Sequence, residues 1–341
     1  MTDIFSRMAK VKQITTCTPL DIPESVLTSN EPIILKGLVN SWPIVQAAKE
    51  STEQASEYIS QYYQGMTVGI GISEAKNSGR LFYNEDFSGF NFTQQSAQLD
   101  DVLTQLLASK HLTLSPSLYV GSTSVDKLLP GFRQENDLAA IAQYKPLVSL
   151  WLGNQSRVAA HHDMPSNIAC CVAGKRRFTL FPPAQLTNLY IGPLDHTPAG
   201  QAISLVDFHQ PDFNKFPNFK KAIEQGLVAE LAPGDALFLP SMWWHHVEGL
   251  SKFNILINYW WQSNPAHMGA PMDALFHALL NIKKLPSHQK SAWFELFKFY
   301  IFNDDPNALS HIPTESLGVL NPTDDKAARH IRAQLLNKLN R

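Results

Sequence analysis

The sequence predicts a mainly β protein with helical additions, built around an antiparallel sandwich or barrel. Two observations favour this class. From about residue 147 to residue 262, short apolar or alternating runs recur, separated by Pro, Gly, Asn and Asp, as in antiparallel strands joined by turns. Outside this stretch, several segments carry apolar residues at every third or fourth position, which predicts helices. The runs of the central stretch are Val148–Leu152, Asn167–Val172, Arg176–Phe181, Ala202–Val206, Ala236–Leu239 and Phe253–Trp261.

The part of the chain before the central stretch mixes both kinds of element. In order, we expect a buried strand at residues 31–37, a helix at 44–64, a strand at 66–72, a helix at 100–110 and a strand at 117–121. Residues 81–92 are aromatic and rich in turn residues, and their pattern assigns them to neither class.

The part after Pro265 returns to a helical pattern, at residues 273–284 and 291–302 and, with a more polar composition, at 326–339. We therefore expect N-terminal α/β elements (1–115) that pack on a β core (116–264), followed by a C-terminal helical region (265–341).

The composition of the 341 residues, 44% hydrophobic and 17% charged, suits a compact protein with a large core. A net charge of −2 gives no global signal for nucleic-acid binding and leaves a local basic groove as an open alternative. The cysteines Cys17, Cys170 and Cys171 form no CxxC pair, so we expect a reducing compartment and no disulfide framework. Because the N-terminus lacks a signal-peptide pattern and no apolar run is long enough to cross a bilayer, we expect a cytoplasmic protein.

The segment around His161 carries the strongest chemical signal. Side chains alternate along a strand, so His161 and Asp163 share a face, with Cα atoms roughly 6.6 Å apart, while His162 faces the other way. A second histidine from another strand would complete the two-His-one-carboxylate set that leaves open positions on Fe(II). His245 or His246, which follow Trp243-Trp244 after a turn, can supply it, and alternation alone does not choose between them.

The ordered motifs resemble those of JmjC-type, cupin-fold 2-oxoglutarate oxygenases, closest to the branch with the asparaginyl hydroxylase of hypoxia-inducible factor and many bacterial cupin-like proteins. The resemblance implies a double-stranded β-helix (jelly-roll) core and Fe(II) held by His161, Asp163 and His245. The matching segments, from about residue 20 to residue 262, are Pro32–Gly37, Trp42-Pro43, Leu118-Tyr119, Leu152-Gly153, His161–Asp163 with Asn167, Gly174–Pro183, Gly234-Asp235 with Pro240, Trp244–Val247 and Asn258–Trp260.

The resemblance also implies a binding site for the distal carboxylate of 2-oxoglutarate. Arg176 stands two residues after Gly174, where the family commonly has lysine, and Val158 stands where a threonine often assists. Alternation places Arg176 on one face with Phe178 and leaves Lys175 on the other. Arginine can bind a carboxylate through two parallel hydrogen bonds. The alternative is a salt bridge from Arg176 to a core acid.

Four further residues match pocket positions of the family: Tyr119, which would meet the same carboxylate, Asn167 and Asn258, which would line the iron and cosubstrate pocket, and Trp260, a wall residue. An ordinary core tyrosine is the alternative for Tyr119. Trp243, Trp244 and Trp261 are expected to serve packing.

The implied function is an Fe(II)- and 2-oxoglutarate-dependent hydroxylase that uses O2 and acts on a protein or peptide side chain. A small-molecule or tRNA-base hydroxylase, a lysine demethylase, a 2-oxoglutarate-independent cupin metalloenzyme, a zinc hydrolase and a non-catalytic cupin-like binding protein remain as alternatives. Residues 83–92 would form a loop over the pocket, or a packed aromatic loop without this role. A homodimer through the C-terminal helices is expected from their apolar residues Phe276, Leu279, Leu280, Trp293, Phe294, Phe297 and Phe299.

Overall fold

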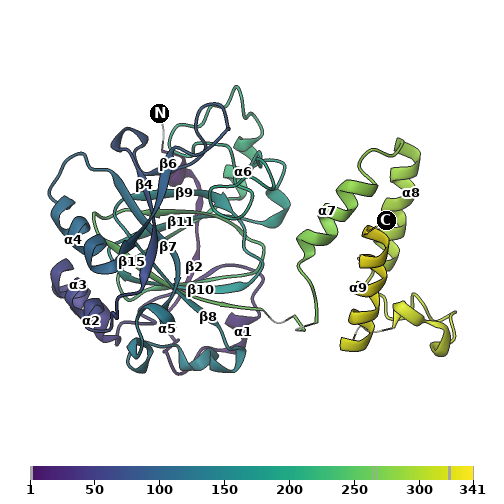
Figure 1. The fold of residues 1–341 in the computed structure, drawn as a ribbon, viewed down its shortest axis with the longest axis horizontal. Coiled ribbons are helices and arrows are strands. Elements are labelled where there is room, and N and C mark those ends of the chain that lie inside the picture. The colour runs from purple at the N-terminus through teal and green to yellow at the C-terminus, as the bar shows by residue number, and fades with distance from the viewer. Residues whose placement is uncertain (1–2, 263, 266, 322–323, 341) are drawn as a thin grey trace. The chain divides into compact units, whose positions relative to one another are not determined.

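The computed structural model describes residues 3–262, 264–265, 267–321 and 324–340, and the chain divides into two compact units, Met1–Gln262 and Ser263–Arg341 (Figure 1). The first unit contains two mixed sheets that pack as a sandwich, with helices before and after it in the chain. The predicted fold class is therefore confirmed. None of the helices in the described residues combines the length and the apolar composition needed to cross a bilayer.

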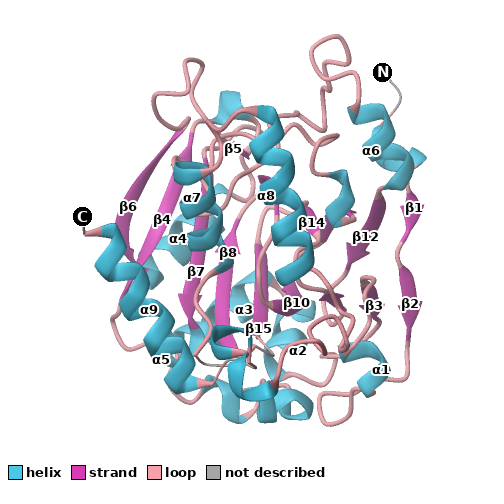
Figure 2. Cartoon of the chain, turned by 90° about the vertical axis from the view of Figure 1, so that its right-hand side faces the viewer, coloured by secondary structure: helices cyan, strands magenta, loops and turns pink. Residues whose placement is uncertain are grey.

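The smaller sheet has six strands in the spatial order β1 (Ala9–Lys10), β12 (Leu227–Leu231), β11 (Arg176–Phe181), β14 (Trp244–Gly249), β9 (Ser156–His161) and β5 (Arg80–Leu81). The larger sheet has nine strands in the order β2 (Lys12–Ile14), β3 (Ile33–Leu35), β13 (Ala236–Leu239), β10 (Ser166–Ala173), β15 (Asn254–Trp261), β8 (Leu147–Gly153), β7 (Ser117–Ser124), β4 (Thr67–Ser73) and β6 (Phe92–Gln98). Figure 2 shows β6 beyond β4 at the end of this sheet.

The helices of the first unit are α1 (Glu24–Leu27), α2 (Pro43–Glu50), α3 (Thr52–Ser60), α4 (Leu99–Ser109), α5 (Val125–Leu128) and α6 (Phe219–Gln225), and those of the second are α7 (Pro271–Asn281), α8 (Ser287–Tyr300) and α9 (Asp325–Leu339). The helix predicted at 44–64 is divided at Ser51. This residue has extended backbone, and its hydroxyl accepts a hydrogen bond from the Gln54 N–H, which caps the start of α3.

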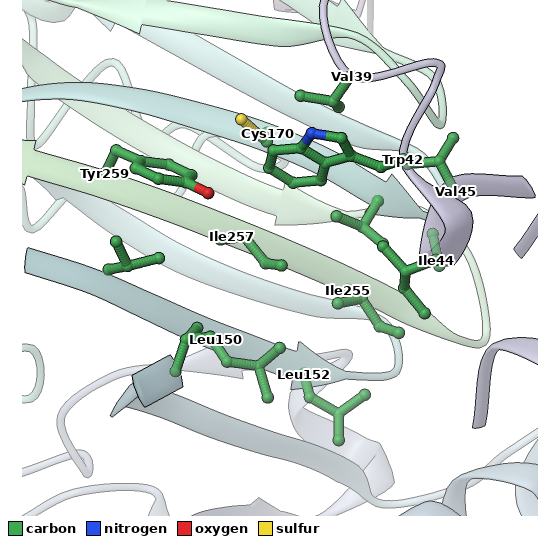
Figure 3. Close-up of a cluster of buried hydrophobic side chains, with 14 of the residues drawn as sticks. Val39, Trp42, Ile44, Val45, Leu150, Leu152, Cys170, Ile255, Ile257 and Tyr259 are labelled. Carbon is green, nitrogen blue, oxygen red and sulfur yellow. The ribbon is translucent and has the colours of Figure 1, made fainter. Parts of the chain in front are cut away.

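The outer face of the larger sheet holds one continuous core. Alternate residues of β8 and β15 belong to this core, among them Leu150, Ile255 and Ile257, together with Trp42 and Val45 at the start of α2 (Figure 3). Each fully buried aliphatic side chain of this kind contributes about 1.5–3 kcal/mol. The remaining residues of the same strands therefore face the space between the sheets.

One predicted strand is absent from the structure, and one segment without an assignment is now placed. Residues 202–206 were expected as a strand, but Ser204 makes only an isolated bridge with Ile191 and donates its N–H to the Ala160 carbonyl. Burial of Ile203 and Val206, not strand pairing, accounts for the apolar run. Residues 81–92, which had no assignment, contribute the end of β5 and the start of β6.

Gly174 forms the turn between β10 and β11. Its φ is +71°, and an added Cβ would lie 2.3 Å from the Phe253 carbonyl oxygen. This turn places Arg176 at the first position of β11. The glycine of the Gly-x-Arg motif is therefore required by the backbone.

We predict that Gly174→Ala lowers the free energy of unfolding by about 3 kcal/mol, because alanine disfavours positive φ and would overlap a fixed carbonyl. Chemical denaturation monitored by circular dichroism measures this. Gly69→Ala is the matched control, since Gly69 lies in β4 without positive φ and with open space around its Cβ position. Equal stability of the two variants would contradict this role of Gly174.

Candidate metal centre

Two neighbouring strands bring the predicted histidines together. In the pairing of β9 with β14, His161 lies opposite His245, and the register shifts by one residue between this pair and Val158–Val247. Such a bulge re-aims side chains, and here it lets both Val158 and His161 line the same cavity. β9 ends at His161, so Asp163 lies just beyond the strand, whereas the alternation argument assumed that the strand continued. The Asp163 carbonyl accepts the Met242 N–H at 2.9 Å, which ties this segment to the turn before β14.

His161, Asp163 and His245 each direct one donor atom to a common point, and these three atoms lie within 4.8 Å of one another. The distance from His245 Nε2 to Asp163 Oδ2 is 3.5 Å. Each histidine Nδ1 lies 2.9 Å from a backbone carbonyl, that of Ala159 for His161 and that of Trp243 for His245. Because Nδ1–H donates to these carbonyls, the Nε2 lone pairs are left for a metal ion.

The electrostatics of the cluster favour the protonation states that bind metal. Burial, reinforced by the neighbouring His245, lowers the pKa of His161 to about 4, so this imidazole is neutral near pH 7. Burial raises the pKa of Asp163, but His245 and His161 outweigh it and bring the value to about 2. Two imidazoles and one carboxylate form the donor set of non-haem Fe(II) sites.

The other two histidines of the paired motifs point away from this cluster. His162 packs edge-on against Trp244, with ring centroids 4.6 Å apart. His246 stacks on Phe208, with its Nδ1 3.7 Å from a carboxylate oxygen of the buried Glu248. The structure therefore places His245, and not His246, with His161 and Asp163.

The cluster opens into a cavity of about 730 Å³ between the two sheets. Arg176 lines this cavity and is only 2% exposed. Within the described residues its guanidinium has no carboxylate within 4 Å, and its Nε has no hydrogen-bond partner. By contrast Arg177, on the opposite face of β11, places its Nε 3.0 Å from Glu230. Of the two explanations for the buried Arg176, the geometry disfavours a salt bridge to a core acid.

Tyr119 lies in the same cavity, close enough to Arg176 for their charges to interact. Burial raises the pKa of Tyr119 to about 12, although Arg176 opposes this. The hydroxyl is therefore protonated at neutral pH and available as a donor. Burial likewise lowers the pKa of Arg176, and Tyr119 is the largest opposing influence. An anionic ligand would stabilise both groups.

Buried polar atoms without a partner in the protein gather in this cavity. They are Trp151 Nε1, Asn167 Oδ1, Arg176 Nε, Asn258 Oδ1 and Trp260 Nε1. A buried donor or acceptor left unpaired costs about 1–3 kcal/mol. A ligand that both accepts and donates hydrogen bonds would satisfy them.

All eight sequence-predicted site residues line this cavity, while Trp243, Trp244 and Trp261 are buried elsewhere in the packing. Trp151 was missed. Its ring centroid lies 5.8 Å from those of both Tyr119 and Trp260. The alternation of side chains along the strand could have identified it. Leu150 and Leu152 face the outer core, so Trp151 between them faces the cavity.

The aromatic segment 83–92 reaches the cavity through Phe92. Phe90 stacks on Phe92 and on His196, and the Tyr83 hydroxyl donates to the His196 carbonyl at 2.7 Å. These contacts join the segment to the loop that contributes Pro198–Gln201 to the cavity wall.

Comparison with known proteins gives consistent matches. Residues 19–267 match the family described as cupin-like domain. The chain is 30% identical over 149 residues to Lysine-specific demethylase JMJ31 of Arabidopsis thaliana, covering 41% of this chain and 27% of that protein. It is 22% identical over 242 residues to Lysine-specific demethylase 8 of Xenopus tropicalis, covering 69% and 49%. It is 24% identical over 257 residues to tRNA wybutosine-synthesizing protein 5 of Gallus gallus, covering 71% and 73%. The chain thus spans half or less of the length of the two demethylases.

We predict that the metal-free protein loses stability as the pH falls from 7.5 to 5. The folded-state pKa of about 4 for His161 and for His246 lies below the ordinary 6.5, so the unfolded state binds more protons in this window. Each histidine then removes about 2 kcal/mol of unfolding free energy by pH 5. Asp163 contributes no slope there, because its lowered pKa affects stability only below its ordinary value of 3.8. Urea denaturation in the presence of a chelator measures the change.

The matched comparison is His161→Gln, which should remove the His161 part of this pH dependence and leave that of His246, with His111→Gln as an exposed control. A pH dependence that is unaltered in His161→Gln would contradict the burial of a neutral imidazole at this position.

Proposed function

The chain belongs to the cupin-like, JmjC-type domain family, and from this premise we propose that it is an Fe(II)- and 2-oxoglutarate-dependent oxygenase that hydroxylates a protein or peptide side chain. The observation that carries the proposal is that one cavity holds both the His161, Asp163 and His245 donor set and the unpaired, buried Arg176. A metal site alone fits many cupins, whereas a buried cation with no carboxylate within salt-bridge distance requires an anionic ligand.

The residues present fit both groups. His161, Asp163 and His245 would hold Fe(II), and Arg176 with Tyr119 would hold the distal carboxylate of 2-oxoglutarate. With these bound, O2 is divided so that one oxygen enters succinate as CO2 leaves and the other converts a substrate C–H into C–OH.

The protein's own contribution is orientation and exclusion of water. The guanidinium of Arg176 can bind a carboxylate through two parallel hydrogen bonds, which fixes the axis of the dicarboxylate. The amide oxygens of Asn167 and Asn258, which have no partner in the protein, are available to accept hydrogen bonds from a ligand in the same cavity. Apolar and aromatic walls, including Trp260 and Phe178, keep bulk water from the reacting centre.

The proposed substrate class also rests on the cavity lining. Arg176 is the only lysine or arginine among the described residues that line it. A tRNA-base substrate, suggested by the name of one relative, would need further cations for its phosphates. A small molecule remains the second candidate because the cavity volume can accommodate one. In a 2-oxoglutarate-independent cupin or a binding protein, the buried Arg176 would have no anionic ligand to pair with its charge.

We predict that the wild-type protein, supplied with Fe(II), 2-oxoglutarate, O2 and ascorbate, produces succinate and that His161→Ala and Arg176→Ala reduce this at least about 100-fold. His161→Ala removes a proposed metal ligand, and Arg176→Ala removes the anion partner. Because turnover without substrate is slow, the visible charge-transfer band of the anaerobic Fe(II) protein with 2-oxoglutarate is measured in parallel.

Lys175→Ala is the matched control, since Lys175 precedes Arg176 directly and its side chain does not line the cavity. It should retain both the succinate and the band. Absence of both signals in the metal-loaded wild type would refute the cosubstrate assignment, and so would full activity of Arg176→Ala.

We also propose that the chain forms a homodimer through its C-terminal helices. In the unit Ser263–Arg341, Ala328 is the only buried residue of those described. Large apolar side chains are exposed on α7 and α8, including Leu280 and Phe294. Exposed apolar patches of this kind are typical of interaction surfaces.

We predict that Leu280→Glu combined with Phe294→Glu converts the dimer into monomer, because buried unpaired carboxylates are costly at an apolar interface. Light scattering coupled to gel filtration measures the mass. Lys290→Glu, also exposed on α8, serves as the control and should remain dimeric. A wild type that is monomeric at all concentrations would refute the proposal.

A further inference from the structure

The open edges of the two sheets differ in a way that bears on substrate binding. The terminal strands β1, β2 and β5 are two or three residues long, and each carries a lysine or arginine. Short length and charge are the usual protection of sheet edges. β6 has neither, because it is seven residues long, with the sequence Phe-Thr-Gln-Gln-Ser-Ala-Gln.

The outer side of β6 is free to pair. In the described residues β6 pairs only with β4, and the backbone groups of residues 93–97 make no other hydrogen bond. Thr93, Gln94, Gln95 and Ser96 are all exposed. Figure 2 shows this strand as the last of the larger sheet.

This free edge is continuous with the metal cavity. Gln94, Gln95 and Ser96 all line the cavity, together with Gly69 and Gly71 of β4. Gln94 and Ser96 lie opposite Gly71 and Gly69 and share their face, whereas Gln95 lies opposite Ile70 on the other face. Three consecutive strand residues line one cavity only if it extends to the edge of the strand.

The lining between this edge and the metal centre is uncharged. Within the described residues Asp163 and Arg176 are the only Asp, Glu, Lys or Arg side chains of the cavity, and both are engaged by the proposed iron and cosubstrate. A cationic or anionic target side chain would therefore be desolvated without a counter-charge, which is unfavourable. Gly69 adds space, because nothing lies within 4 Å of its Cβ position.

We propose that an extended segment of a partner protein pairs with β6 as an added strand and directs an uncharged side chain into the cavity. This inference rests on the proposed function, since it names how that function's substrate is bound. Main-chain hydrogen bonds to the edge supply affinity in this mode, and a pocket for alternate side chains supplies selectivity. The neutral composition of β6 indicates a segment that is uncharged where it crosses the strand.

The experiment uses peptide pools, one for each amino acid fixed at the central position with mixed Ala, Ser, Thr, Val and Gln flanks, and the Fe(II)-loaded full chain. Mass spectrometry detects the gain of one oxygen after incubation with 2-oxoglutarate and O2. We expect product in one or more pools with an uncharged central residue and none in the Lys, Arg, Asp or Glu pools.

The best peptide is then made in two forms, N-methylated at odd or at even positions. An added strand pairs through alternate N–H groups, so one form should lose at least about tenfold in product and the other should retain it. Gln95→Lys should reduce peptide oxidation by a similar factor, whereas Gln13→Lys on β2, at the opposite end of the same sheet, should not.

Four results would overturn the inference: equal effects of the two methylated forms, oxidation only of charged pools, an unaffected Gln95→Lys, or no oxidised pool although the 2-oxoglutarate band is present. A change of oligomeric state in Gln95→Lys would also overturn it, by assigning the edge to a second copy of the chain. Absence of the band itself would instead refute the proposed function on which the inference rests.

Discussion

The positive charge buried at Arg176 constrains the rest of the structure. A guanidinium stays protonated in proteins, and an isolated buried charge is strongly destabilising. Yet Arg176 shares its cavity with Tyr119, Phe178 and Leu256, and among the described residues no carboxylate lies within salt-bridge distance of its guanidinium. An anion bound in the cavity would pair this charge, and the turn at Gly174 sets the start of β11 and thereby the position of Arg176.

The two histidines of the proposed metal site lie on strands of the same sheet as Arg176. β14 lies between β11, which carries Arg176, and β9, which carries His161. One antiparallel ladder thus sets the spacing between the proposed iron site and the proposed carboxylate site. The register shift between β9 and β14 also affects the site. It brings His161 opposite His245 while Val158 remains on the cavity wall. Strand registers position Arg176 and the two histidines, whereas Asp163 lies just beyond the end of β9.

The fold class was predicted from the sequence, and the eight residues proposed for the site all line one cavity. Both depend on local signals, namely the alternation of side chains along β11 and the order of the motifs along the chain. Other features depend on tertiary structure. The segment 202–206 contains buried apolar residues but forms only one isolated bridge and no strand, so hydrophobicity alone suggested a strand. β6 has a polar composition that predicts no burial, and only its pairing with β4 reveals it. The role of Trp151 needed the knowledge that Leu150 and Leu152 face the outer core.

The hydrogen bonds that orient the two metal-binding histidines end on main-chain carbonyls, those of Ala159 and Trp243. In many metal sites this support comes from a carboxylate side chain, which mutation can remove. Here the acceptors are main-chain carbonyl groups, which remain when the side chain of Ala159 or Trp243 is replaced. Sequence drift can therefore reshape the cavity for new substrates while the imidazoles keep their tautomer and direction. The orientation of these two imidazoles is therefore less exposed to point substitution than it would be with side-chain acceptors.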